Sequence, residues 1–470
     1  MKQYNAVIVG SGPNGLSAAI TIAEQGGSVL VLEAADEIGG GTRTSALTMP
    51  GFSHDVCSTV HPLAISSPFF RRLPLKKHGL EWIQPPSEFA HPLDDGTAVL
   101  LNRSVEETAA GLGEDAEAYQ KLMKPLTSRA EELIGEVMQP LLRFPKHPLL
   151  LARFGFSAIQ SAQKLAKTRF HGARARALFA GVAAHSMIPL SWPGSSAIGL
   201  ILGVAGHLRG WPIPRGGSRS ISQALASYLR ALGGEIQTGV RVKSLEELPS
   251  SRWTFLDVTP KQLAEIGSAR LSESQKQRLS RFQYGMGVYK MDFALSGPIP
   301  WLAPECARAA TVHLGGTLAE IAQSERDAQE GCVSEKPFTL LAQPSLFDAS
   351  RAPDGQHVAW AYCHVPNGSA SEMSIAIENQ IERFAPGFRA RILARSILRP
   401  ADLERYNPNY IGGDISGGAM NLMQALFRPR LSLSPYTTPI ENVFLCSSST
   451  PPGPGVHGMC GYLAARSVLN

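Results

Sequence analysis

Three glycines and one acid near the N-terminus have the spacing of a dinucleotide-binding motif. Gly10, Gly12 and Gly15 form the pattern GxGxxG, and Glu33 follows about 20 residues later. In this pattern Gly10 permits a tight turn, Gly12 lets the backbone approach a pyrophosphate, and Gly15 lets a helix pack closely on a strand. A carboxylate in the position of Glu33 receives the hydroxyls of a ribose.

The segments around these residues are the elements needed to position them. An apolar run from Tyr4 to Val9 predicts a strand, the small residues from Leu16 to Gly27 predict a helix, and Ser28 to Leu32 predict a second strand ending at Glu33. This order predicts a Rossmann-type unit. Its candidate cofactor contacts are Gly10, Gly12, Pro13, Asn14, Gly15, Glu33 and Ala34.

Two further glycine-rich segments accompany the first. Residues 39–44 read GGGTRT, a second cluster for which a simple nicotinamide enzyme has no need. Near the C-terminus, residues 442–446 (NVFLC) predict a buried strand, and a Pro/Gly-rich loop leads from it into a helix beginning near Gly458. A helix N-terminus at the end of such a loop favours negative charge on a ligand.

Together these segments resemble FAD-binding proteins of the flavin amine oxidase and phytoene desaturase superfamily. The resemblance implies FAD as cofactor, with the second cluster along its diphosphate and the C-terminal loop at its isoalloxazine. A strand reading Val-x-Val passes the adenine in this family, and Val240 and Val242 match it. The implied additional contacts are Gly40, Gly41, Thr42, Arg43, Val242, Gly455, Val456, His457, Gly458 and Met459.

Four longer segments narrow the resemblance to one branch. They are GFSHDVCSTVHPLA (51–64), YGMGVYKMDFAL (284–295), SLFDASRAPDGQHVAWAYCHVP (345–366) and PGPGVHGMCGYLAAR (453–466). They resemble the branch with phytoene desaturase-like proteins and pyridine nucleotide-disulfide oxidoreductase domain-containing proteins. The six cysteines include no closely spaced pair, so neither a redox disulfide nor a metal cluster is expected.

The implied fold class is α/β: a non-contiguous Rossmann-type FAD-binding domain, as in glutathione reductase, with an inserted mixed α+β substrate domain. The expected FAD-binding segments are 1–75, 209–280 and 431–470. The expected substrate-domain segments are 76–208, basic and helical, and 281–430, a β-sheet.

Charge is unevenly distributed along the chain. The total of 44 Lys and Arg against 39 Asp and Glu is nearly balanced, but residues 137–234 contain twelve basic residues and no acid. Residues 151–167 predict a basic amphipathic helix, which either lies on anionic lipid or packs its apolar side into the core. Residues 196–208 predict an apolar helix, either lining a lipid-sized tunnel or lying in the core.

Location and partners follow from the same composition. No run of eighteen apolar residues and no leader pattern is present, so a cytoplasmic protein is expected, with peripheral contact at an anionic inner membrane face. Nucleic acid is disfavoured because aromatic residues are sparse among the basic ones. A homo-oligomer is one of the partner states that the composition allows.

Catalytic residues carry the weakest signal, because flavin hydride transfer needs mainly correct placement of a C–H bond. His457 is the candidate for substrate orientation or proton transfer, and His54, Asp55 and His61 are expected near the cavity. The resemblance implies desaturation, saturation or isomerisation of an apolar, isoprenoid-like or lipid-like substrate. The alternatives are an oxygen-using amine oxidase and an FAD-binding protein that acts through a partner.

Overall fold

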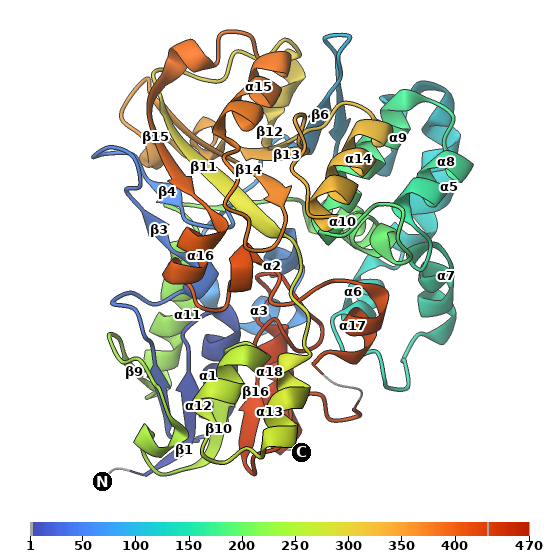
Figure 1. Ribbon diagram of the computed structural model, residues 1–470. Coiled ribbons are helices and arrows are strands. Elements are labelled where there is room, and N and C mark those ends of the chain that lie inside the picture. The colour runs from blue at the N-terminus through green and yellow to red at the C-terminus, as the bar shows by residue number, and fades with distance from the viewer. Residues whose placement is uncertain (1–2, 430–431, 470) are drawn as a thin grey trace.

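The computed structural model of the chain describes residues 3–429 and 432–469. Figure 1 shows a sheet with both chain ends beside it at the bottom, a second sheet above it, and a group of helices at the right. Segments far apart in the sequence therefore meet in each sheet.

The lower sheet is a parallel sheet of Rossmann type. Its strand order is β16-β10-β1-β2-β9, and all neighbouring strands run parallel. The strands are β1 (Tyr4–Val9), β2 (Val29–Leu32), β9 (Glu235–Gln237), β10 (Ser251–Leu256) and β16 (Val443–Leu445). Both faces of β1 are buried, with Ala6 and Ile8 in one apolar cluster and Val7 and Val9 in another, which explains its uninterrupted apolar sequence. The predicted fold class is confirmed.

Helices cover both faces of this sheet. Helices α1 (Pro13–Ala23), α11 (Arg219–Ala231) and α18 (Met459–Leu469) pack together on one face. Helix α12 (Pro260–Ile266) contributes to the other face and is followed by α13 (Glu273–Ser280). Small residues let the first and last helices approach closely: a Cβ at Gly461 would lie 1.8 Å from the carbonyl oxygen of Asn14.

The upper sheet has seven strands in the order β15-β11-β14-β13-β12-β6-β7. They are β6 (Ser87–Pro92), β7 (Ala98–Leu101), β11 (Gly287–Leu295), β12 (Ala309–Leu314), β13 (Thr339–Ala342), β14 (His357–Val365) and β15 (Ile392–Leu398). Tyr289, Met291 and Phe293 of β11 pack with α15 (Ser374–Phe384) on one face. Because side chains alternate along a strand, Lys290 and Asp292 point to the opposite face.

The helical group surrounds α10 (Ser195–Arg209). It comprises α4 (Val105–Ala110), α5 (Ala116–Thr127), α6 (Ala130–Val137), α7 (Pro148–Ala158), α8 (Ala162–Arg169) and α9 (Ala173–Ala183), with α14 (Leu318–Gln329) packed on α9. In the part of the chain that the structure describes, no helix combines the length and hydrophobicity needed to cross a bilayer.

The single helix expected over residues 151–167 is two helices. The side chain of Ser161 accepts a hydrogen bond from the backbone N–H of Lys164 and so begins α8 as an N-cap. The apolar side chains of Phe154, Ala158 and Leu165 are buried, so the apolar face of this segment packs into the protein.

Short elements complete the chain: β3 (Thr44–Ser45) with β4 (His54–Asp55), β5 (Trp82–Ile83) with β8 (Ile213–Pro214), α2 (Pro62–Ser66), α3 (Pro68–Arg72), α16 (Pro400–Tyr406) and α17 (Leu422–Phe427). Segment 76–208, expected to be helical, also gives β6 and β7 to the upper sheet. Val240 and Val242 lie outside β9, not in a strand, because pairing with β2 ends at Gln237. The expected boundary at 430–431 lies outside the described residues.

Candidate active site

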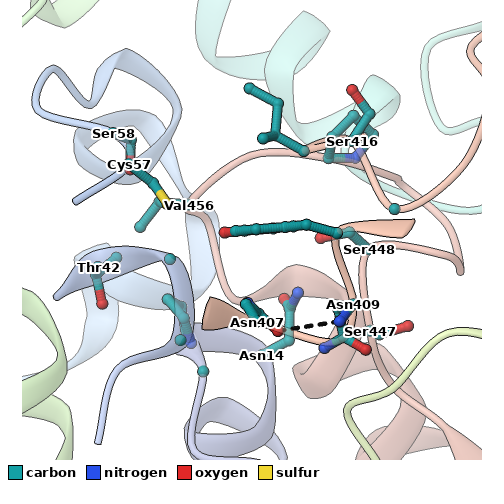
Figure 2. A pocket seen from close by; sticks show the side chains of 18 of the residues that line it. Asn14, Thr42, Cys57, Ser58, Asn407, Asn409, Ser416, Ser447, Ser448 and Val456 are labelled. Carbon is teal, nitrogen blue, oxygen red and sulfur yellow. Dashed lines mark hydrogen bonds between the residues drawn. The ribbon is translucent and has the colours of Figure 1, made fainter. Parts of the chain in front are cut away.

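One cavity of about 730 Å³ extends from the parallel sheet to the seven-stranded sheet. Most of the predicted cofactor contacts line it: Gly10, Gly12, Pro13, Asn14, Glu33, Ala34, Gly40, Gly41, Thr42, Arg43, Val242, Gly455 and Val456. Figure 2 shows Thr42, Cys57 and Ser58 on one side and Ser416, Ser447 and Ser448 on the other. Segments from both ends of the chain and from the inserted domain therefore share one cavity.

The two N-terminal glycine clusters pack backbone against backbone. A Cβ at Gly15 would lie 2.1 Å from the carbonyl oxygen of Gly10, and one at Gly40 would lie 3.2 Å from the Cα of Gly12. Gly10 has a φ of 102°, which side-chain-bearing residues rarely adopt. Helix α1 begins after Gly12, which has no side chain to cap the helix, and among the backbone N–H groups of its first turn that of Gly15 is bound by the carboxylate of Asp257. The cradle thus places a helix N-terminus at the cavity, the usual place for a phosphate.

Glu33 links these segments through both carboxylate oxygens. Its Oε2 accepts hydrogen bonds from the backbone N–H of Ser11 at 3.0 Å and from the Ser11 hydroxyl at 2.6 Å. Its Oε1 accepts from the N–H of Ala35 at 2.9 Å and from Nη2 of Arg43 at 3.0 Å. Arg43 is therefore the buried counter-ion of Glu33, which joins the GxGxxG turn to the second cluster.

Asp257, which sequence reasoning missed, lies beneath the GxGxxG turn. Its Oδ2 accepts a hydrogen bond of 3.0 Å from the N–H of Gly15 and lies 2.7 Å from where a Cβ on Gly12 would be. Burial raises the pKa of Asp257 to about 7, and the nearby Glu33 carboxylate contributes. The available signal was its position directly after a parallel strand, because ligands of such sheets bind at the carboxyl ends of strands.

The residues present fit FAD. Among the described residues, the buried Oδ1 of Asn14 has no hydrogen-bond partner, and Asn14 lines the cavity. Buried polar atoms of this kind normally have a partner, and a polar ligand would supply one. The N-terminus of α1 would hold the diphosphate and Glu33 the adenosine ribose.

The contacts predicted for the C-terminal loop fall into two groups, one that lines the cavity and one that does not. Gly455 and Val456 line the cavity, whereas Gly458 lies against α1 with its Cβ position 2.2 Å from the Ser17 hydroxyl. His457 is buried, and its Nδ1 accepts a hydrogen bond of 3.0 Å from the backbone N–H of Met459. Burial lowers its pKa to about 4. The ring caps the start of α18, and neither it nor Met459 lines the cavity, so the structure does not support substrate orientation by His457.

Of the three residues expected beside the second cluster, only His61 lines the cavity, with its Nε2 2.8 Å from the Ser218 hydroxyl. Asp55 instead pairs with Arg351, and both side chains are fully buried. His54 lies with its Nδ1 3.6 Å from Oδ1 of Asp292, outside the cavity lining. The polar groups of Asp55 and His54 therefore contact other protein side chains outside the cavity lining.

The end of the cavity beneath the seven-stranded sheet is mainly apolar. Its lining includes Met187, Ile198, Ile201 and Leu202 from the helical side and Leu340, Trp360 and Tyr362 from the sheet. The rings of Trp360 and Tyr362 are stacked at an angle of 10°, with centroids 5.6 Å apart. An apolar molecule of lipid or isoprenoid type would find complementary walls there.

Lys290, also missed by sequence reasoning, is the buried cation of this wall. Its Nζ lies 2.5 Å from Oδ2 of Asp292 and 5.3 Å from the ring centroid of Trp360. Burial raises the pKa of Asp292 to about 6, against the opposing effect of Lys290. The signal was two charged residues two positions apart in an otherwise apolar strand, which places both on one face.

This fold and cavity define a dinucleotide-binding protein of Rossmann type. The family described as NAD(P)-binding Rossmann-like domain matches residues 8–73. The chain is 29% identical to pyridine nucleotide-disulfide oxidoreductase domain-containing protein 2 of Mus musculus, over 99% of this chain and 93% of the relative. It is 24% identical to the lycopene-forming phytoene desaturase of Pseudescherichia vulneris, over 98% of both chains.

The solved structure of putrescine oxidase bound to putrescine has a similar fold, with a TM-score of 0.63, 17% identity, and coverage of 100% of this chain and 99% of that one. These comparisons support an FAD-dependent oxidoreductase that is similar to phytoene desaturases over nearly its whole length. Its cofactor is FAD, as the resemblance implied.

Proposed function

We propose that this FAD-dependent oxidoreductase acts on carbon–carbon bonds of an apolar, isoprenoid-like or lipid-like substrate by desaturation, saturation or isomerisation. The observation that carries the proposal is the continuity of the cofactor cradle with the apolar wall formed by Ile198, Ile201, Leu202 and Leu340. When bound, FAD supplies a two-electron acceptor or donor. The chain itself holds the substrate against the cofactor and excludes water through these side chains.

An oxygen-using amine oxidase is the second candidate, because putrescine oxidase shares the fold and Trp360 and Tyr362 form an aromatic wall. An alkylammonium substrate would use such a ring face as a cation site. Here Lys290, paired with Asp292, already lies over the Trp360 ring and takes the position that a substrate cation would need. The occupied ring therefore favours the apolar substrate.

Two experiments test this proposal. In the first, the purified protein is denatured and the small molecules that it releases are identified by mass spectrometry. In the second, the intact holoprotein is mixed anaerobically with lipid-like or isoprenoid compounds and, separately, with primary amines. We expect released FAD, and bleaching of flavin absorbance by an apolar compound alone. Ile201→Trp should block that reaction because Ile201 lines the cavity, whereas Leu208→Trp on the same helix should not. Reduction by amines, with peroxide formed when oxygen is then admitted, would contradict the proposal, and flavin that no substrate reduces would favour the partner-binding alternative.

We also propose that an exposed apolar and basic surface beside α7 and α8 contacts anionic lipid. Phe144, Leu149, Phe156 and Ile159 are 99%, 84%, 71% and 57% exposed. Phe156 and Ile159 border a shallow hollow together with Lys164 and Arg169. Exposed aromatic and aliphatic side chains among basic residues, in a segment without acids, fit an anionic membrane surface.

Co-sedimentation with vesicles tests this surface. We expect binding to phosphatidylglycerol vesicles, weak binding to phosphatidylcholine vesicles, and release by added salt. The double variant Phe144→Ser/Phe156→Ser should lose at least about tenfold in affinity, since two large apolar side chains no longer enter the interface. Ile375→Ser, at an exposed apolar residue on α15, is the control. Equal sedimentation of the double variant and wild type would contradict the proposal that this surface contacts lipid.

A further inference from the structure

Three polar atoms at the apolar end of the cavity have no protein partner. They are Nδ1 of His185, the hydroxyl of Thr311 and the hydroxyl of Tyr362, and all three residues line the cavity. None of these atoms forms a hydrogen bond with a described residue, yet none is sealed off as Nδ1 of the neighbouring His313 is. Polar groups inside a protein normally have a partner, so a ligand or water is expected to supply it.

His185 and Thr311 border the same part of the cavity, where β12 pairs with β6. His185 lies in the turn Ala184–Ser186 after α9, and its ring centroid is 5.5 Å from that of Trp211. The Trp211 ring packs on Phe89 with centroids 4.9 Å apart, and Phe89 of β6 pairs directly with Thr311 of β12. Figure 1 shows α9 and α10 beside this part of the sheet.

This polar end is far from the buried cation Lys290. Thr311 lies on β12 and Lys290 on β11, and strands β13 and β14 separate them in the sheet. With about 4.8 Å between neighbouring strands, the two positions are roughly 14 Å apart. Leu340 of β13 and Trp360 of β14 line the cavity between them. The cavity is therefore apolar along this wall and polar again at its end.

The ring of His185 is neutral and is held in place from behind. Its Nε2 lies 2.9 Å from Nε2 of His313, which stands beside His91 of the neighbouring strand. Burial lowers the pKa of His185 to about 3, and His364 contributes to the shift. A neutral imidazole offers one donor or one acceptor at its open nitrogen. It therefore suits an uncharged oxygen and gives no counter-charge to a carboxylate or a phosphate.

A hydroxyl group is the oxygen substituent that fits His185 in either of its neutral forms. If Nε2 of His185 donates to His313, the open Nδ1 is an acceptor. If His313 donates instead, Nδ1 carries the proton and is a donor. A hydroxyl can donate or accept, whereas a carbonyl can only accept. The hydroxyl of Thr311 can likewise do either, so both residues can bind one ligand hydroxyl whichever nitrogen carries the proton.

We propose that the apolar substrate carries a hydroxyl group and that His185 and Thr311 bind it at the end of the cavity remote from Lys290. The inference rests on the proposed action on an apolar substrate and narrows its class to an alcohol of isoprenoid or lipid type. Binding at this end fixes how far the substrate enters and so which carbon–carbon bond lies against the cofactor. A hydrocarbon would leave both polar groups without a partner, which discriminates against it.

Anaerobic calorimetric titration of the holoprotein with farnesol, and with the same triene lacking the hydroxyl, tests the proposal. The ratio of the two dissociation constants is compared between variants, because the hydration of the free ligands is the same in every titration. Thr311→Val keeps the shape of the side chain and breaks no hydrogen bond to a described residue. We expect it to weaken farnesol binding about fivefold and to leave hydrocarbon binding unchanged.

His185→Phe should have the larger effect, a loss of at least about tenfold in farnesol affinity with hydrocarbon affinity unchanged or improved. Phenylalanine keeps a ring of similar size but offers no nitrogen to the ligand. This variant also deprives Nε2 of His313 of its partner, so its stability is measured beside its affinity. Thr311→Val, which has no such side effect, keeps the test decisive if His185→Phe does not fold.

Two tyrosine variants serve as matched controls. Tyr119→Phe removes a buried hydroxyl that is bonded to His207 outside the cavity lining, and the ratio should not change. Tyr362→Phe removes the third open hydroxyl, on the residue that pairs with Lys290 across β14 and β11, and should change the ratio little. A hydroxyl-specific loss in Tyr362→Phe and none in Thr311→Val would place the ligand hydroxyl elsewhere and overturn the proposal.

The two proposals fail in different ways. If the wild type binds neither farnesol nor the hydrocarbon, the proposed apolar substrate class is wrong and the alcohol falls with it. If the wild type binds the hydrocarbon, but the ratio is the same in wild type, Thr311→Val and His185→Phe, the apolar site stands and only the hydroxyl site is wrong.

Discussion

Replacing Asp55 with asparagine should destabilise the protein by about 3–5 kcal/mol, as expected when one member of a buried ion pair is removed. The Asp55 and Arg351 side chains are both fully buried, with Nη2 of Arg351 2.6 Å from Oδ2 of Asp55. Asparagine would leave the guanidinium in the interior without a counter-charge. The same carboxylate also accepts hydrogen bonds from Thr44, Thr59 and the N–H of Ser218, so it ties together segments from three parts of the chain.

The pH dependence of this contribution has a definite sign. Burial alone would raise the pKa of Asp55, but Arg351 and the donated hydrogen bonds hold it below its ordinary value. A carboxyl group with a lowered pKa in the folded state stabilises the protein above its unfolded pKa, and this stabilisation is lost as the pH falls through the folded pKa. The difference between wild type and Asp55→Asn should therefore be complete at neutral pH and shrink in acid.

Denaturant unfolding at fixed FAD concentration measures the effect. Asp94→Asn, which breaks a partly exposed pair with Arg383, should cost no more than about 1 kcal/mol. The double variant Asp55→Leu/Arg351→Met should recover only part of the loss: no unpaired charge remains, but Thr44, Thr59 and the N–H of Ser218 lose their acceptor. A loss no larger in Asp55→Asn than in Asp94→Asn would mean that this buried pair contributes little.

The cofactor cradle was predictable because its determinants are local. Gly10, Gly12 and Gly15 act through turn geometry and close packing within a few residues, and Glu33 ends the next strand. The pairing of Arg43 with Glu33 was harder to predict, because the spacing of Arg43 from the paired glycines does not say which carboxylate it binds. His457 shows the limit of such reasoning. The side chain of a histidine in a loop beside the cavity points either to the ligand or to its own backbone. Here Nδ1 of His457 accepts a hydrogen bond from the backbone N–H of Met459.

The apolar wall of the cavity was not predictable, because it forms only when distant strands pair. Lys290 and Trp360 meet across β11 and β14, and His313 comes close to His91 because β12 lies beside β6. Sequence alone places each of these residues on a strand face but does not say which face turns toward FAD. The break between α7 and α8 was readable in principle, since Ser161 is a favoured helix start.

Replacing Glu33 with alanine should lower FAD affinity at least about 100-fold, and the purified variant should contain little flavin. Four hydrogen-bond donors lose their acceptor: the N–H and hydroxyl of Ser11, the N–H of Ala35 and the guanidinium of Arg43. Arg43 would be left buried without its counter-charge, and the GxGxxG turn would no longer be held against the second glycine cluster. Both effects act on the cradle rather than on the distant apolar wall.

Flavin absorbance per protein after gel filtration, and titration of the apoprotein with FAD, measure this effect. Glu33→Gln keeps one acceptor oxygen and should bind FAD with intermediate affinity, about tenfold weaker than wild type. Glu37→Gln changes an exposed carboxylate on the same segment and should retain FAD fully, because only the backbone carbonyl of Glu37 contacts Arg43. Full retention of FAD by Glu33→Ala would contradict the assignment of the N-terminal cradle as the adenosine end of the site, since no other described carboxylate both lines the cavity and joins the two glycine clusters.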